Sequence, residues 1–442
     1  MEFPWVQALA LVVSYAVLSL GTWLVWPSRW NVFAQYNFGF FFVAYFVPAL
    51  LTDELTQFQP AVLNLYTEIM AVGAFMYLIG LYAGANSPRL LINGRSLFTL
   101  PSTPEAAEFV RQRCVWMVVA SVIGLYLSFS IMGYVALFSA QPMQAKYFHD
   151  QYRPGYLRAI WLYLPSASAF VAYAPILVSI AFLRRGYRRY FLVLLAGMGA
   201  FALELHRGEV GSPMLLGVAI LFAASRLRHS IVEFLVVCLL VWSIGAVFNY
   251  VLMVYFDVGT MRAGNSEVTI WTLIAGGAPD INDSMHFLSR FMNHPQYSLG
   301  RNIIGGLMPN QYKWNPGLWS LSVAREMTRE EVVNFAAGGL RLAIPVTGFA
   351  SFDWLGVNII SFGIGFATGY IVAFARRHVA AAPVEVKSVV LIVAWCLIGN
   401  LDAPTWHLMT PLLMLAPLIY PMRFRLLSST SQRSSIIAGA AT

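Results

Sequence analysis

Residues 161–183 read WLYLPSASAFVAYAPILVSIAFL, a run without a charged side chain. A helix rises about 1.5 Å per residue, so this run is long enough to cross the roughly 30 Å hydrocarbon layer of a bilayer. Backbone polar groups find no partners in lipid, so a spanning segment is either a helix or part of a closed barrel. The run is continuously apolar rather than alternating, and it therefore predicts a transmembrane helix.

Similar apolar runs recur along the whole chain. The protein is 59% hydrophobic and 11% charged, whereas soluble proteins carry roughly 25% charged residues. The first run has no basic segment before it and is interpreted as a membrane span rather than a cleaved signal peptide. The sequence predicts an all-α polytopic membrane protein of about eleven transmembrane helices, within a range of ten to thirteen. The predicted spans are 5–26, 34–52, 63–84, 114–133, 161–183, 190–204, 212–224, 231–252, 352–375, 388–405 and 409–422.

These spans divide the chain into four parts. Residues 1–252 hold the first eight transmembrane helices with short loops between them. Residues 253–351 form one large loop, rich in Gly, Pro, Asn and Trp, between the eighth and ninth helices. Residues 352–424 hold the last three helices, and the Ser-rich tail 425–442 is expected to be mobile. A loop of such length is expected to fold over one membrane face, which is a common place for function.

Basic residues predict how the chain is oriented. Short loops rich in Lys and Arg stay in the cytoplasm, so the loops that alternate with them lie outside. This rule places the N-terminus and the large loop outside and the C-terminus in the cytoplasm. The basic residues assigned to the cytoplasmic side are Arg29, Arg89, Arg95, Arg111, Arg113, Arg184, Arg185, Arg188, Arg189, Arg226, Arg228, Arg376, Arg377, Lys387, Arg423, Arg425 and Arg433.

Several signatures of other functions are missing from the sequence. It has no GxxxxGK[ST] loop for ATP, no HExxH motif, no cysteine pair for zinc and no DxD motif. The net charge of +8 is explained by membrane orientation, so nucleic acid is not a predicted partner. The three dispersed cysteines form neither a disulfide framework nor a metal site. We therefore expect no metal and no cofactor.

Arginines in the outer regions are the main candidates for binding an anion. Arg207 begins the turn segment RGEVGSP between two predicted spans, and Glu204 and Glu209 lie close to it in sequence. An arginine there has the planar fork that fits a lipid phosphate. The alternative is an ion pair with one of the two glutamates that fixes the end of a helix.

Arg301 and Arg341 stand in the apolar, glycine-rich stretches LGRNIIGG and GGLRLAIP without an adjacent acid. An arginine without an acidic neighbour favours binding of an anion, and a structural role is the alternative. In contrast, the mixed charges of SVAREMTREEVVNFAAGG (322–339) predict a short surface helix that ends at Gly338 and presents a solvated face.

Candidate bases also lie in the large loop. His294 and His286 have the side chain that most often transfers protons near neutral pH, and Asp280 and Asp283 are comparable candidates. His149 is a further candidate in the segment 134–160. Each single histidine is more often a packed or exposed bystander. Gly363, Gly365 and Gly369 resemble a ligand loop, but inside a span such a spacing favours close helix packing.

The combined pattern resembles the repeat-unit polymerases of O-antigen and exopolysaccharide, the Wzy type. The resemblance covers most of the chain. It rests on the number of helices, the Arg207-Gly208 pair at an outer turn, and the late loop with LGRNIIGGLMPNQYKWNPG and GGLRLAIPVTGFASFDWLGVN. The segment MGYVALFSA, with Lys146 and Arg153 after it, is similar to the first outer loop of that family.

This resemblance implies a metal-independent, GT-C-like glycosyltransferase that polymerises undecaprenyl-diphosphate-linked oligosaccharides at the periplasmic face. Its implied partners are that lipid-linked substrate, membrane lipid and a polysaccharide chain-length regulator. Such a reaction needs cations at the diphosphate and a base near the attacking hydroxyl. We expect Arg207, Arg301 and Arg341 to contact the diphosphate with Arg262 and Arg290 behind them, and His294 to be the base, followed by Asp280 and Asp283.

Three other functions remain open from the sequence. An O-antigen ligase uses the same donor and topology but joins the glycan to a lipid acceptor. Other GT-C enzymes place an acid in the first outer loop, where this chain has Asp53 and Glu54. A flippase or transporter predicts charged or broken helices in the middle of the membrane, whereas Glu68 is the deepest acid in these spans. A structural subunit of an export complex would tolerate the loss of every arginine named.

Overall fold

The computed structural model describes part of the chain, and every regular element in that part is a helix. The described residues are 5–25, 45–46, 58–87, 100–224, 243, 247, 280–307, 314–328, 331–332, 339–340, 342–379, 381–402 and 406–422.

Five of the described helices are long and apolar enough to cross a membrane. They are α1 (Trp5–Val25), α6 (Pro60–Asn86), α7 (Pro104–Met132), α9 (Arg153–Leu183) and α18 (Ile344–Val379). Shorter apolar helices accompany them, and the whole has the character of a multi-pass membrane protein. This confirms the predicted all-α membrane class. The predicted spans 34–52 and 231–252 fall almost entirely outside the described residues, so the number eleven stays a prediction.

The shorter helices coincide with the remaining predicted spans. They are α10 (Phe191–Leu203), α11 (Arg207–Ala224), α19 (Val384–Asp402), α20 (Trp406–Met414) and α21 (Ala416–Pro421).

Several helices begin well before the apolar run that predicted them, because a cap and not hydropathy sets the end of a helix. At α7, Thr103 Oγ1 accepts a hydrogen bond from the Ala106 N–H and Pro104 occupies the first turn, ten residues before the predicted start.

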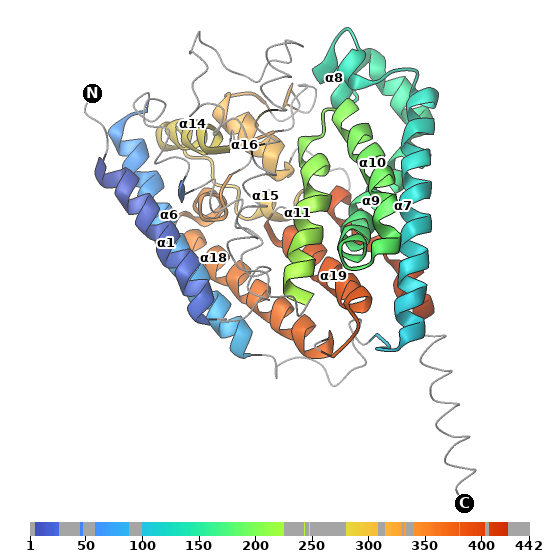
Figure 1. Ribbon diagram of the computed structural model, residues 1–442. Helices are drawn as coiled ribbons and strands as arrows, with labels where there is room; N and C mark the ends of the chain where they lie inside the picture. Colours follow the sequence, from blue (N-terminus) through green and yellow to red (C-terminus); the bar gives the residue numbers. More distant parts are fainter. Residues whose placement is uncertain are drawn as a thin grey trace, which may run out of the picture.

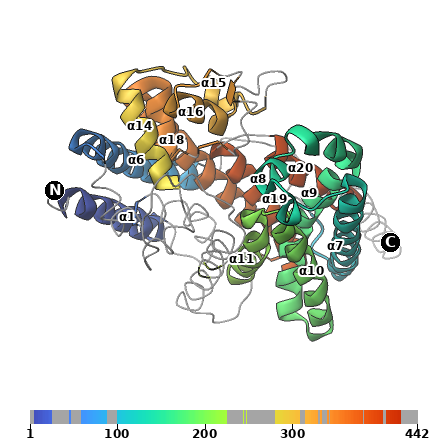
Figure 2. The same ribbon diagram turned by 90° about the horizontal axis from the view of Figure 1, so that it is seen from above.

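Two groups of helices make up the membrane part. In Figure 1, α1, α6 and α18 lie on one side and α7, α9 and α10 on the other, and the view from above in Figure 2 separates the same groups. The most buried of the long helices is α9. Its Tyr173 hydroxyl donates to the Met414 carbonyl at 2.8 Å, and its Ser179 hydroxyl lies 3.1 Å from that of Ser388 on α19. The helix α9 thus joins the C-terminal helices to the earlier ones.

Glycines let α6 and α18 touch backbone to backbone. A Cβ added to Gly80 would lie 2.1 Å from the Phe362 carbonyl oxygen, and one added to Gly84 would lie 2.0 Å from that of Phe366. In the reverse direction, a Cβ on Gly365 would lie 2.2 Å from the Tyr77 carbonyl oxygen. This confirms that the glycine run in the predicted ninth span serves helix packing, although a Cβ on Gly363 would meet nothing.

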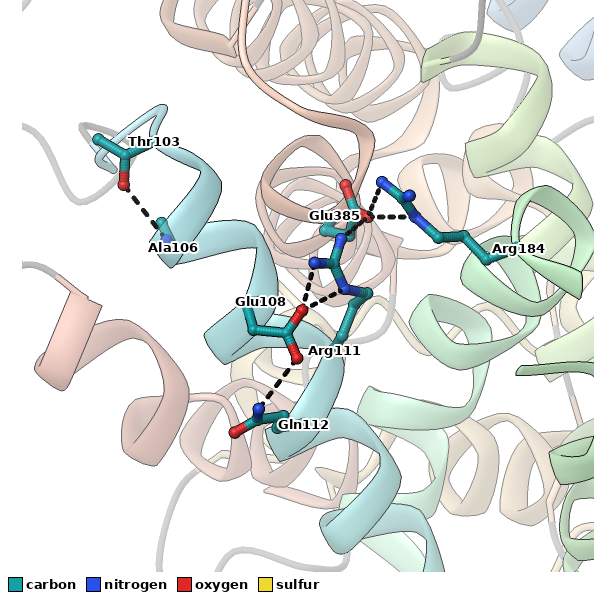
Figure 3. A network of polar contacts seen from close by, with 7 residues as sticks. All are labelled: Thr103, Ala106, Glu108, Arg111, Gln112, Arg184 and Glu385. Atoms are coloured by element: carbon teal, nitrogen blue, oxygen red, sulfur yellow. Dashed lines mark hydrogen bonds and ion pairs between the residues drawn. The ribbon is translucent and has the colours of Figure 1, made fainter. Parts of the chain in front are cut away.

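Basic loops gather at one end of the helices, where a network of charges joins three of them (Figure 3). Arg111 of α7 donates from Nη1 to Oε1 of Glu385 at 2.7 Å, and Arg184 after α9 donates from Nε to the same oxygen at 3.2 Å. Arg111 also bonds Glu108 one turn earlier. Glu385, at the start of α19, is buried. We call this end the basic end; its assignment to the cytoplasm stays a prediction.

The opposite end carries the short helices, and we call it the loop end (Figure 1). There lie α8 (Pro142–Lys146) and, from the large loop, α14 (Asp280–Asn293), α15 (Arg301–Ile304) and α16 (Pro316–Ala324). The predicted loop was expected to extend to residue 351, but α18 already begins at Ile344. Its first turns therefore belong to the predicted loop, and they anchor the loop helices to the membrane part.

Candidate functional site

The helix α14 is amphipathic and forms the base of the candidate site. Phe287 and Phe291 are buried and stack on each other with centroids 5.3 Å apart, and Phe287 also packs 5.6 Å from Trp319 of α16. The opposite face of α14 exposes His286 and Arg290. Because the apolar face is fixed against α16, the polar face has a defined direction at the loop end.

A pocket of about 430 Å³ opens where the ends of α14 and α16 meet. Its polar lining residues are Arg290, His294, Gln296, Ser322, Glu326 and Thr328. Arg290 Nη1 lies 3.0 Å from Glu326 Oε1, and both side chains are more than half exposed. An exposed pair of this kind is weak, so an anion that enters the pocket competes with Glu326 for the guanidinium at little cost.

The pocket exists because α16 ends earlier than the sequence predicted. The expected continuous helix over 322–338 is broken after Ala324, and Glu326 adopts a left-handed φ of +56°. A new helical turn starts at Thr328, whose N–H donates to Glu331 Oε2 at 2.7 Å while the Glu331 N–H donates to Thr328 Oγ1 at 3.2 Å. This reciprocal capping box starts a helix, so the sequence carried a start signal inside the predicted helix. Glu326 consequently faces Arg290 instead of lying on a solvated helix face.

The segment that follows α14 is tied to α18 by a buried polar cluster. The Ser298 hydroxyl donates to Asn302 Oδ1 at 2.6 Å, and the Ser351 hydroxyl lies 3.0 Å from the same oxygen. The Ser298 N–H donates to the Ala350 carbonyl at 3.1 Å. All three side chains are buried. A satisfied buried network is rigid, so the residues between Ser298 and Asn302 are held in one position on the membrane part.

Arg301 lies within this held segment. Leu299 and Gly300 both have left-handed φ angles, +51° and +79°, and the resulting turn leads directly into α15. The Arg301 side chain is exposed, and its guanidinium carbon lies 5.3 Å from the centre of the Trp314 ring, which is itself buried. The ring restrains the guanidinium by cation–π contact and leaves its donors free to bind an anion.

A break in α18 adjoins Arg301 and lies where the sequence analysis ended the large loop, at residue 351, and began the ninth span, at residue 352. Phe352 and Asp353 leave helical geometry, and Asp353 has φ +56° and ψ −148°, a conformation that is essentially reserved for glycine. Asp353 Oδ1 accepts the Trp354 N–H at 2.9 Å, and Oδ2 accepts the Tyr297 hydroxyl at 3.3 Å. Partial burial and the Asp353 charge raise the pKa of Tyr297, so its hydroxyl stays a donor. Neither glycine nor proline marks the break, so the conformation of Asp353 itself was not predicted.

The structure places the predicted site residues in different ways. Arg290 and His294 line one pocket, and His294 follows the last turn of α14, with its N–H on the Arg290 carbonyl at 3.0 Å. Asp283 lies on α14, and Asp280 is its first residue. Arg262 and Arg341 lie outside the described residues.

Two other predicted arginines, Arg301 and Arg207, and a second histidine do not line that pocket. Arg207 is the first residue of α11, and Figure 2 shows α11 well apart from α14, α15 and α16. His286 packs edge-on against Phe58 at 5.0 Å, and burial and the charge of Arg325 lower its pKa.

The chemistry available at this site is therefore cationic and proton-transferring. The pocket offers the exposed guanidinium of Arg290 and the exposed imidazole of His294. Arg301 does not line this pocket and offers a second exposed guanidinium beside the break in α18. No family model, no curated protein and no solved structure matches this chain.

Proposed function

We propose that this protein is a glycosyltransferase that polymerises polyprenyl-diphosphate-linked oligosaccharide repeat units at the outer face of a bacterial inner membrane. The observation that carries the proposal is the position of Arg301. An exposed guanidinium stands on a rigid turn beside the top of a membrane helix, so one surface offers both a cation and apolar side chains.

The apolar part of that surface belongs to α18. A Cβ added to Gly300, the residue before Arg301, would lie 3.1 Å from Cζ of Phe352. Phe352, Leu355 and Ile359 are all exposed and follow one another down α18 from its break. A substrate that fits this surface has a polyanionic head and a long hydrocarbon tail. A polyprenyl diphosphate has both, and its tail can remain in lipid while its head meets Arg301.

The chemical roles follow from the groups at the loop end. Arg301 binds the diphosphate, and Arg290 exchanges Glu326 for an anionic oxygen when substrate enters. His294 accepts the proton of the attacking hydroxyl. The hydroxyl oxygen then forms a bond to the anomeric carbon, while the bond from that carbon to the diphosphate oxygen breaks and the diphosphate leaves with the electron pair. Preorganised cations stabilise this developing charge, and one such donor is worth about 3–4 kcal/mol in comparable sites.

Two alternatives use the same features differently. A ligase would transfer the finished glycan to a lipid acceptor, and a flippase would only move the lipid-linked unit. We favour transfer because the candidate groups Arg290, His294 and Arg301 collect at the loop end. In the described residues the long helices carry few charges between their ends.

The test is a deletion strain in which lipid-linked glycans and surface polysaccharide are extracted and sized. Loss of a polymerase leaves single repeat units, loss of a ligase leaves long lipid-linked chains, and loss of a flippase traps units on the cytoplasmic side. Complementation with Arg301→Ala should reduce polymer by at least tenfold, and Arg301→Lys should restore part of it, since lysine keeps the charge but loses the fork. The matched control is Arg158→Ala, an exposed arginine at the start of α9. Full polymer from Arg301→Ala at normal protein levels would refute the assigned role.

A further inference from the structure

The turn between α10 and α11 holds a buried carboxylate without a hydrogen-bond partner among the described residues. Glu204 is 1% exposed, and neither of its carboxylate oxygens meets a donor. A carboxylate in such a place loses its hydration and gains nothing in return, so its charged form is strongly disfavoured. Burial raises the pKa of Glu204 from 4.5 to about 7.

The turn around Glu204 is held in a strained form. The His206 N–H donates to the Phe201 carbonyl at 2.9 Å and the Leu205 N–H to the Ala202 carbonyl at 3.0 Å. This is the bond pattern of a Schellman motif, which normally places glycine at the left-handed position. Here that position is Leu205, with φ +62°. A leucine with a left-handed φ costs free energy that glycine would not, so we expect its side chain to make a compensating contact.

The Leu205 side chain attaches the turn to a cap. We define the cap as residues 134–152, which contain η2 (Ala136–Phe138), α8 and η3 (Asp150–Tyr152). Leu205, Ala136, Ala145 and Tyr152 form a small hydrophobic cluster separate from the main core. The Ala136 N–H faces the Glu204 carboxylate without reaching hydrogen-bond geometry. The cap therefore covers the carboxylate. It is held by this cluster and by Phe148, which stacks on Tyr156 of α9 with ring centroids 3.8 Å apart.

Among the described side chains, none forms an ion pair with Glu204. From the cap comes the Tyr134 hydroxyl, which is buried and has no described partner. From α9 comes Tyr163, whose hydroxyl also interacts with the charge of Glu204. On the turn itself, His206 Nδ1 lies 3.8 Å from Oε2 of the exposed Glu209, so this ion pair is with that carboxylate and not with Glu204. Arg207 follows as the first residue of α11.

We propose that Glu204 is a proton-binding site whose protonation closes the cap over the α10–α11 turn. With the cap closed, the carboxyl is neutral and costs little to bury. When Glu204 ionises, the cap opens, the carboxylate gains water, and the turn that leads to Arg207 becomes accessible. The ligand of this site is a proton, so the inference stands apart from the proposed glycosyl transfer and does not depend on it.

The direction of the pH effect follows from linkage. The closed state binds the proton with the raised pKa, and the open state binds it with the ordinary value near 4.5. Closure is therefore favoured most at low pH and is lost progressively as the pH rises from about 4.5 to about 7. The opening equilibrium should increase on the order of tenfold per pH unit in that window and level off above it.

The experiment measures cap opening in the purified full-length protein. Ala136→Cys places a thiol at a fully buried cap position, and its rate of alkylation, read by peptide mass spectrometry, reports opening. The matched control is Ala136→Cys in a Glu209→Gln background. It has the same thiol chemistry and keeps Glu204, so its alkylation rate should depend on pH as that of Ala136→Cys alone does. In a Glu204→Gln background, which keeps the shape and removes the charge, alkylation should be slow and should lose the excess increase between pH 5 and 7.

Two results would overturn the proposal. One is an alkylation rate of Ala136→Cys that depends on pH in the same way with and without Glu204→Gln. The other is an alkylation rate of Ala136→Cys, with Glu204 intact, that stays constant from pH 5 to 7. If Ala136→Cys does not fold, amide hydrogen exchange over residues 134–152 in the unmodified protein and in Glu204→Gln gives the same comparison. The infrared band of a protonated carboxyl should also be present at pH 6 and absent in Glu204→Gln.

Discussion

Replacing Glu385 by alanine should destabilise the protein by about 3 kcal/mol, because this carboxylate joins three helices at the basic end (Figure 3). Removing one partner of a buried ion pair typically costs about 3–5 kcal/mol, since the other charge remains buried. Arg111 is such a charge, with only 14% of its side chain exposed and Glu385 Oε1 2.7 Å away.

The lower end of that range applies here for two reasons. Arg111 keeps Glu108, whose Oε2 lies 3.0 Å from its Nε. Arg184 is 55% exposed, so its pair with Glu385 contributes at most about 1 kcal/mol.

The assay is equilibrium unfolding in detergent micelles with a graded denaturing detergent. Glu108→Ala is the matched control, because Glu108 is exposed and contacts the same arginine, and its replacement should cost about 0–1 kcal/mol. The double variant Arg111→Ala, Glu385→Ala should cost less than the two single variants together, since it leaves neither of the two buried charges without its partner. If Glu385→Ala costs no more than Glu108→Ala, the network does not stabilise the fold and this reasoning fails.

Three further predictions concern other parts of the fold. Gly365→Ala should destabilise by about 1–3 kcal/mol, because its Cβ would meet backbone of α6, whereas Gly363→Ala, two residues away, should be neutral; equal unfolding curves for the two variants would contradict this. Asp353→Gly should retain or raise stability by removing backbone strain, while Asp353→Ala keeps the strain, loses the Trp354 cap and should cost about 1 kcal/mol; the reverse order in thermal unfolding would be inconsistent with strain. Glu204→Gln should stabilise the protein at pH 8 by at most about 3 kcal/mol, from about 1.4 kcal/mol per pKa unit, with no gain near pH 4.5; an equal gain at both pH values would argue against ionisation of Glu204 as the cause.

The membrane helices were predictable because a continuous apolar run of about 20 residues matches the thickness of a bilayer and, in lipid, satisfies its backbone hydrogen bonds as a helix. The predicted spans 5–26, 63–84 and 161–183 each lie on a described helix. The ends of those helices were less predictable, because capping residues such as Thr103 extend a helix beyond its apolar part. The sequence placed the boundary between the large loop and the ninth span at the break in α18, but not the strained conformation of Asp353. That strain is sustained by contacts with Tyr297 and Trp354 that exist only in the folded chain.

The candidate site was predictable in part. Arg290 and His294 were identified by residue type and do line one pocket, because they are four residues apart at the end of the same helix. Their neighbour Glu326 was assigned to a solvated helix face, since the capping box at Thr328 was not recognised as a new start. Glu204 was considered only as a partner for Arg207. Its isolation depends on the cap, residues 134–152, which precedes Glu204 by more than fifty residues in the sequence.

The backbone contact between α6 and α18 has a consequence for the order of events during synthesis. The two helices are separated by the chain from Ser87 to Ala343. At about 5–20 residues per second, on the order of ten to fifty seconds pass before α18 follows α6 out of the ribosome. During that time the flat glycine face of α6 has no partner, and any other helix with small residues can occupy it. The earlier helix α1 packs on α6 through Gly21 and Leu78, so this contact leaves Gly80 and Gly84 available to the ninth predicted span.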